Sequence, residues 1–132
     1  MDKLSPRLSE REANQLNMLA LAHVGDAVYE LLVRSMLCCE KNSSVMQLHR
    51  RTVQKVRAEA QAESAEKLLP VLTEGELAVY KRGRNAKVNS VPHHAELAQY
   101  HAATGLEALF GWLYLQGKTE RIGELFAAIA EE

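Results

Sequence analysis

The feature that most constrains this chain is one aspartate, Asp26, inside a run of residues with helical periodicity. Apart from Asp2, it is the only aspartate in the protein. A carboxylate within or beside a hydrophobic core is costly unless a cation or hydrogen bonds stabilise it. The apolar residues around it recur at the three- and four-residue spacing of one helix face: Leu16, Leu19, Ala20, Val24, Ala27, Val28, Leu31 and Leu32.

A second carboxylate, Glu107, lies in a similar apolar segment between residues 104 and 115. Neither segment has a Lys or Arg one helical turn from its acid that could pair with it. A metal ion held jointly by Asp26 and Glu107 would explain both residues, because carboxylates are preferred ligands of hard cations. The alternative is that both acids lie at the edges of amphipathic helices and face water.

The composition predicts an all-α fold in one domain, residues 1–132, with a core from about 14 to 130. Val, Ile and Thr are sparse, whereas Ala, Leu, Glu and Gln are frequent, which favours helices over a sheet. Capping-box patterns begin at Ser44 and Thr73. Gly25 costs a helix about 1 kcal/mol relative to Ala, which indicates close packing against another helix. We expect helices over residues 13–38, from 44, and over 54–69, 73–82, 93–117 and 119–130, with an extended loop over 85–92.

The formal net charge of −1 does not predict a polyanionic partner, but the distribution of charge does. Two blocks are basic and contain no acid, at residues 49–57 and 81–87. They predict a local phosphate-binding surface, and the alternative is ordinary solvated helix faces. The candidate residues for binding RNA are Arg50, Arg51, Lys55, Lys81, Arg82, Arg84, Asn85 and Lys87.

The cysteines and the chain ends exclude several classes of protein. Cys38 and Cys39 are adjacent, and no Cys/His spacing typical of a zinc site is present. The first residues lack the apolar core of a signal peptide, and no apolar run reaches membrane-spanning length without a charge. We therefore expect a soluble, cytoplasmic protein.

Two motifs carry a family resemblance. The sequence Val-Gly-Asp-Ala-Val-Tyr-Glu at 24–30 resembles the signature helix of the ribonuclease III endonuclease domain. The sequence Leu-Glu-Ala-Leu-Phe-Gly at 106–111 resembles the second catalytic helix of that family, in the right order and roughly eighty residues later. With its short length and the basic block at 81–87, the chain is similar to Mini-ribonuclease III, the branch that lacks a separate double-stranded-RNA-binding domain.

The resemblance implies a dimeric, all-α endoribonuclease that cleaves double-stranded RNA and leaves 5′-phosphate ends. It implies that Asp26 and Glu107 are the catalytic residues and hold Mg²⁺, for which Mn²⁺ can substitute. It also implies maturation of precursor 23S ribosomal RNA, with a ribosomal protein as a candidate partner that presents the RNA. The apolar faces around Asp26 and over residues 106–115 exceed what one small core can absorb, which independently favours a homodimer.

The chain departs from the larger ribonuclease III enzymes at two positions. Their additional acids lie one turn before each catalytic carboxylate, where this chain has Ala22 and Thr104. The rest of the metal coordination is therefore open, and nearby His23 and Glu30 are expected to be structural rather than ligands. Two rival functions follow, an inactive RNA-binding relative of the same fold and an unrelated helical interaction module.

Overall fold

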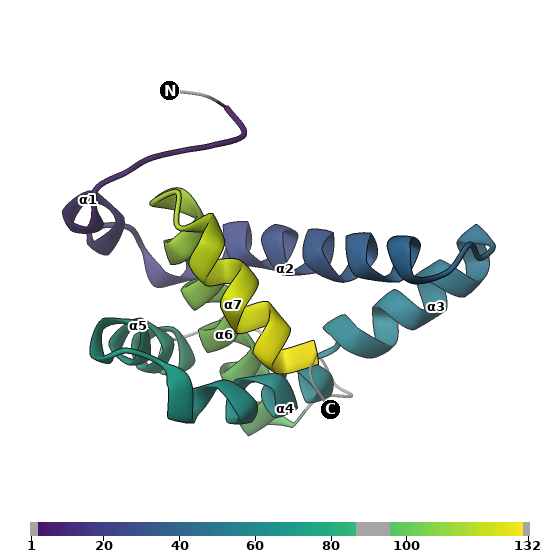
Figure 1. Ribbon diagram of the computed structural model, residues 1–132. Helices are drawn as coiled ribbons and strands as arrows, with labels where there is room; N and C mark the ends of the chain where they lie inside the picture. The colour runs from purple at the N-terminus through teal and green to yellow at the C-terminus, as the bar shows by residue number, and fades with distance from the viewer. Residues whose placement is uncertain (1–2, 87–95, 131–132) are drawn as a thin grey trace.

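The computed structural model describes residues 3–86 and 96–130, and those residues form helices and no strand, which confirms the all-α prediction (Figure 1). No helix in this part of the chain is both long and apolar enough to cross a membrane. The predicted cytoplasmic location and single domain stay predictions. The elements are α1 (Glu10–Asn14), α2 (Met18–Glu40), α3 (Val45–Val56), α4 (Ala58–Leu68), the short 3₁₀ turn η1 (Leu69–Val71), α5 (Glu74–Arg84), α6 (Leu97–Leu115) and α7 (Thr119–Ala130).

Helix α6 forms the centre of the fold, and α2, α4, α5 and α7 pack around it (Figure 1). A helix that is apolar on every side is typical of a buried position, and Glu107 is the only Asp, Glu, Lys or Arg in α6. Its large side chains from Leu106 to Leu113 are buried within the protomer, so the core takes up much of the apolar surface expected there, and the predicted homodimer stays a prediction. The largest of these buried residues are Leu106, Leu109, Phe110, Trp112 and Leu113.

Helices α2 and α6 cross with their backbones in contact. A Cβ atom added at Gly25 would lie 1.6 Å from the carbonyl oxygen of Glu107, and one added at Gly111 would lie 2.0 Å from that of Leu21. Only glycine fits at both positions, because a Cβ atom would overlap backbone that cannot rotate away. The close helix packing predicted from Gly25 is confirmed, and it brings residues 26 and 107 to the same crossing.

The start of α2 differs from the prediction of one helix over residues 13–38. The side-chain oxygen of Asn17 accepts hydrogen bonds from the backbone N–H groups of Leu19, at 2.7 Å, and Ala20, at 3.4 Å. Asn at an N-cap satisfies donors that the first helical turn leaves free. The preceding residues form the separate helix α1, which begins with a capping box between Ser9 and Glu12.

The buried face of α2 also differs from the prediction. Leu16, Leu19 and Leu31 are exposed, with 37%, 38% and 65% of their surface accessible. The helix has apolar residues on two faces, and the need to turn Gly25 toward α6 decides which face is buried. Asp26 is exposed and lies beside the buried stripe, which consists of Leu21, Ala22, Gly25, Tyr29, Val33 and Leu37.

The prediction of one helix over residues 54–69 is wrong because the chain breaks at Arg57. That residue is extended, with φ −67° and ψ 157°, and separates α3 from α4. The other boundaries agree more closely. Ser44 caps α3 and Thr73 forms the predicted capping box with Glu76, α5 continues to residue 84, α6 begins at 97 and α7 spans 119–130. The loop predicted over 85–92 lies mostly outside the described residues.

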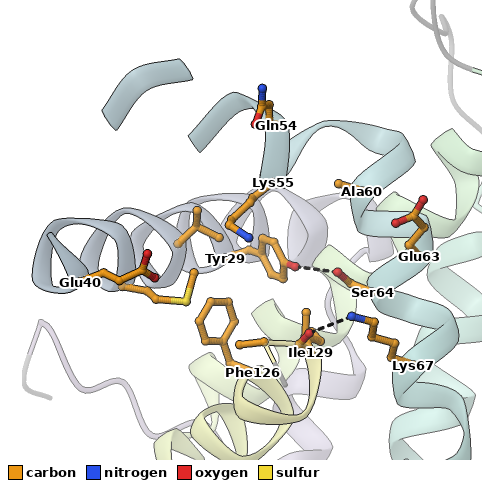
Figure 2. A pocket seen from close by; sticks show the side chains of 13 residues that line it. Tyr29, Glu40, Gln54, Lys55, Ala60, Glu63, Ser64, Lys67, Phe126 and Ile129 are labelled. Carbon is orange, nitrogen blue, oxygen red and sulfur yellow. Dashed lines mark hydrogen bonds between the residues drawn. The ribbon is translucent and has the colours of Figure 1, made fainter. Parts of the chain in front are cut away.

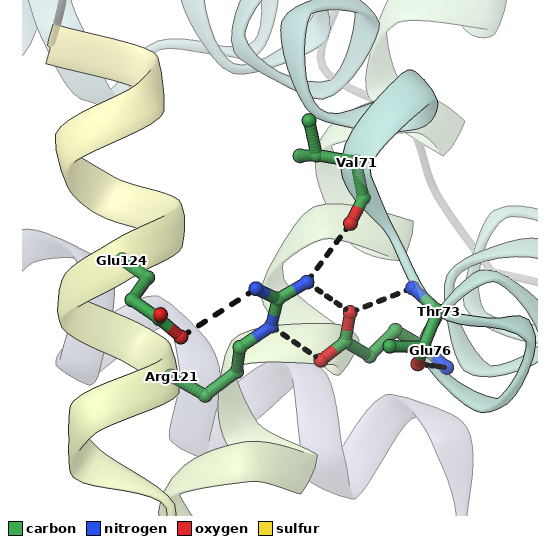
Figure 3. Close-up of polar contacts among 5 residues, drawn as sticks. All are labelled: Val71, Thr73, Glu76, Arg121 and Glu124. Atoms are coloured by element: carbon green, nitrogen blue, oxygen red, sulfur yellow. Dashed lines mark hydrogen bonds and ion pairs between the residues drawn. The ribbon is translucent and has the colours of Figure 1, made fainter.

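An arginine on α7 holds that helix against the beginning of α5 (Figure 3). Arg121 donates two hydrogen bonds of 2.8 Å to the buried carboxylate of Glu76 and one of 2.9 Å to the carbonyl oxygen of Val71. Burial alone would raise the pKa of Glu76, but the hydrogen bonds from Arg121 and from the Thr73 backbone outweigh it and lower the pKa. The carboxylate therefore stays ionised and paired, as expected for a bidentate Arg–Glu contact.

Candidate active site

The two acids singled out by the sequence lie together where α2 crosses α6. Asp26 is exposed and Glu107 is half-buried, and the two side chains lie close enough to interact electrostatically. Burial raises the pKa of Glu107, and the nearby charge of Asp26 raises it further, to about 8. Two carboxylates this close repel when both are ionised. The crossing thus creates a site where a cation would relieve the repulsion.

The donors at this site fit a hard divalent cation that keeps part of its water shell. Within residues 3–86 and 96–130, no group of three or more His, Cys, Asp or Glu side chains is placed to hold a metal. Glu30 is engaged elsewhere, in an ion pair of 2.6 Å with Arg34. Mg²⁺ usually takes only one or two protein carboxylates and several waters, so Asp26 and Glu107 are sufficient for it.

A cavity of about 390 Å³ opens beside Glu107, between α3, α4 and α6. Two of its polar residues, Arg57 and Gln61, were not predicted to belong to the site. Arg57 belongs to the first basic block, and its position at a helix break was not predicted. Gln61 was hidden among the small residues of α4. The cavity is lined by Val53, Val56, Arg57, Ala58, Glu59, Gln61, Tyr100, Ala103, Thr104 and Glu107.

The second basic block lies against the segment of α6 that carries Glu107. A Cβ atom added at Gly83 would lie 2.8 Å from the Cβ of Ala108 and 3.4 Å from the carbonyl oxygen of Thr104. Lys81 and Arg82 are exposed beside it. The second basic block therefore lies at the end of α5, which packs against α6, the helix that carries Glu107.

The remaining residues of that block have local contacts or lie outside the described chain. The guanidinium of Arg84 lies over the ring of Tyr80, 5.7 Å from its centroid, and donates a hydrogen bond of 3.5 Å to Asn85. Both residues remain at the surface near the end of α5. Lys87 lies outside the described residues, so its predicted contact with RNA stays a prediction.

The predicted RNA-binding residues of α3 are not brought to the carboxylates. Arg51 forms an ion pair of 2.7 Å with Glu40, and Arg50 is exposed. Lys55 lines a different cavity, of about 310 Å³, together with Glu40 and Glu63 (Figure 2). That cavity lies between α2, α3, α4 and α7, and neither Asp26 nor Glu107 lines it. Among the basic residues of the first block, Arg57 is the one that lines the cavity beside Glu107.

Comparison with known proteins gives consistent similarities. Residues 19–118 match the Ribonuclease III domain family. The chain is 43% identical to the Mini-ribonuclease 3 of a Thermoanaerobacter species, covering 95% of this chain and 90% of that protein. It is 46% identical to the Mini-ribonuclease 3 of Symbiobacterium thermophilum, covering 92% and 95%. A crystal structure of a Fusobacterium nucleatum protein superposes with a TM-score of 0.81 at 28% identity, covering 90% and 95%.

Proposed function

Because this chain belongs to the ribonuclease III domain family, we propose that it is a metal-dependent endoribonuclease that cleaves double-stranded RNA. The observation that carries this proposal is the contact between Asp26 and Glu107 at the crossing of α2 and α6. Bringing two carboxylates together costs free energy in the absence of a cation. In a phosphodiester hydrolase, such a pair of carboxylates can bind the metal ion that promotes hydrolysis.

Each residue has a distinct part in the proposed mechanism. Asp26 and Glu107 would hold Mg²⁺, or Mn²⁺ in its place. Bound there, the ion would supply positive charge for the phosphoryl oxygens and a more acidic water. The half-buried Glu107 is fixed by the packing of α6, whereas the exposed Asp26 faces the side from which RNA must approach. Arg57 and the basic end of α5 would neutralise neighbouring phosphates, and the products would carry 5′-phosphates.

The proposed substrate is double-stranded RNA in precursor 23S ribosomal RNA, which would place the protein in the cytoplasm. A ribosomal protein that presents the RNA is a further candidate partner. Duplex RNA is recognised mainly by its shape, its phosphates and its 2′-hydroxyl groups, which suits the exposed Lys and Arg side chains at the end of α5. A cleavage assay on a long RNA duplex, with and without Mg²⁺, tests the function directly.

One observation keeps a second function under consideration, an RNA-binding relative with little or no catalytic activity. The larger ribonuclease III enzymes have further acids at two positions where this chain has Ala22 and Thr104. The site therefore has fewer acidic side chains than theirs. The two functions differ in a single result. A protein that binds duplex RNA tightly but yields no Mg²⁺-dependent products would support the second and contradict the first.

We propose that the protein acts as a homodimer, because each chain supplies one carboxylate pair and a duplex has two strands. The apolar stripe of α2 that the core does not use is a candidate interface, and Leu31 is its most exposed large residue. Sedimentation at micromolar concentration should show a dimer, and Leu31→Glu should shift it toward monomer. Val71→Glu, at a residue that is also half-exposed, is the control and should leave the dimer intact. A monomeric parent that cuts both strands would contradict the proposal.

Replacing Arg82 by Ala should weaken binding to every duplex alike, because phosphate contacts carry no sequence information. The slope of log affinity against log salt concentration should become shallower by roughly one unit for each contact removed. The alternative is that Lys81 and Arg82 interact only with the dipole at the end of α5, which stabilises the helix by about 0.3–1 kcal/mol for each residue.

Fluorescence anisotropy over a salt series measures the slope. Arg34→Ala is a suitable control, because Arg34 is an exposed arginine that is paired with Glu30 on α2. An unchanged slope in an Arg82→Ala, Lys81→Ala double variant would show that the end of α5 does not contact phosphates.

A further inference from the structure

Gln61 on α4 is a polar side chain buried almost completely, with 1% of its surface exposed. A buried amide is costly unless its donor and its acceptor both find partners. Its Nε2 donates a hydrogen bond of 3.0 Å to the carbonyl oxygen of Val56. Val56 ends α3, where the extended residue Arg57 interrupts the helix. One half of this amide therefore joins α3 to α4.

The amide also lies beside the carboxylate site. Gln61 lines the cavity of about 390 Å³ together with Glu107 and Thr104, and its amide lies close enough to the Glu107 carboxyl to lower the pKa of that group, against the effects of burial and of Asp26. Its oxygen, Oε1, is buried and has no hydrogen-bond partner in the described residues. Leaving such an acceptor unsatisfied is unfavourable, so Oε1 is suited to accept from a donor held at the site.

The positions one turn before each carboxylate cannot provide this support. Ala22 has no polar group, and the hydroxyl of Thr104 donates to the carbonyl oxygen of Tyr100 at 3.0 Å. The polar side chain that reaches Glu107 comes instead from α4, a different helix. Its placement depends on the break at Arg57, because that break leaves the Val56 carbonyl available to Nε2.

We infer that Gln61 is a positioning residue of the Asp26–Glu107 site, which fixes the Glu107 carboxylate and accepts, through Oε1, a hydrogen bond from water held at the site. This inference rests on the proposed function, since it assigns Gln61 to the same metal site. Residues that orient metal ligands commonly change metal affinity or activity by about 10–100-fold when they are replaced.

Gln61→Leu and Gln61→Glu separate this role from a purely structural one. Leu has a similar size and neither polar atom, whereas Glu keeps an acceptor and adds a carboxylate. The matched control is Ser64→Ala, on the same helix as Gln61, which removes a buried hydrogen bond of 3.2 Å donated by the Tyr29 hydroxyl of α2. Ser64 does not line the cavity beside Glu107. Calorimetric titration with Mg²⁺ alone, without RNA, measures binding at a pH above the pKa of Glu107.

Gln61→Leu should weaken Mg²⁺ binding by about 10–100-fold and lower kcat similarly, with little change in KM for duplex RNA. Gln61→Glu should bind Mg²⁺ more tightly than the parent protein. Ser64→Ala should lower the melting temperature and leave Mg²⁺ binding unchanged.

Unchanged Mg²⁺ affinity in Gln61→Leu, with a lower melting temperature alone, would overturn the inference. If Gln61→Leu does not fold, unchanged affinity in Gln61→Glu overturns it instead. The two proposals can fail separately. A parent protein that cleaves no duplex RNA, but whose Mg²⁺ affinity depends on Gln61, would contradict the proposed function and support the positioning role.

Discussion

Glu107→Gln and Asp26→Asn should each reduce cleavage of duplex RNA by about a thousand-fold or more, while the protein stays folded. Each amide keeps the shape of the acid but is a much weaker ligand for a divalent cation, and loss of metal catalysis removes several kcal/mol of transition-state stabilisation. Single-turnover cleavage at saturating RNA and Mg²⁺ measures the effect. The control is Glu30→Gln, since Glu30 lies one turn from Asp26 but is paired with Arg34.

Although Glu107→Gln should lose activity, it should make the folded protein more stable when no metal is present. The pKa of Glu107 in the folded protein is about 8, above the usual value of 4.5. Between these values the folded state keeps a proton that the unfolded state has released, so metal-free stability should fall as pH rises from 4.5 to about 8. In Glu107→Gln this part of the pH dependence should disappear, and the variant should melt higher than the parent above pH 8.

Thermal melts over a pH series, in chelator and then in excess Mg²⁺, measure this linkage. Excess Mg²⁺ should stabilise the parent and not the variant, because only a ligand that binds the folded state raises its stability. Near-parental cleavage by either acid variant at saturating Mg²⁺ would show that the carboxylate pair is not the catalytic site.

The site could be predicted from the sequence further than the path of the chain around it. Asp26 and Glu107 stood out because an isolated carboxylate in an apolar helix needs a physical reason. The prediction of which face of α2 is buried was wrong. The helix is apolar on two sides, and only the approach of α6 to Gly25 selects one of them. Local periodicity carries no information about such a tertiary contact.

Gln61 shows a second limit of the sequence. Glutamine is common on exposed helix faces, and the run from Ala58 to Leu68 reads as an ordinary helix. Its burial follows from the break at Arg57, and no proline or glycine at that position marks the break. The link between Gln61 and Glu107 is visible only once α4 is packed against α6, 46 residues apart in the chain.

Gly25→Ala and Gly111→Ala should be the most damaging substitutions for the fold. The new Cβ atoms would lie 1.6 Å from the Glu107 carbonyl oxygen and 2.0 Å from the Leu21 carbonyl oxygen. Real contacts of this kind need more than 3 Å, so the two central helices must move apart. Overpacking usually costs about 1–3 kcal/mol, but here the obstacle is backbone, and we expect a loss of about 4 kcal/mol or more.

Chemical denaturation followed by circular dichroism measures this loss, and Gly123→Ala provides the matched control. Nothing lies within 4 Å of a Cβ atom at Gly123, on α7, so alanine there should stabilise its helix by up to about 1 kcal/mol. Comparing the stability changes of the two crossing variants with that of Gly123→Ala separates the effect of the helix crossing from the effect of helix propensity. The same crossing sets the position of Asp26 relative to Glu107, so any Gly25→Ala protein that still folds should also bind Mg²⁺ more weakly. Parental stability in both crossing variants would mean that α2 and α6 do not meet at these glycines, and the geometry of the carboxylate pair would then be wrong as well.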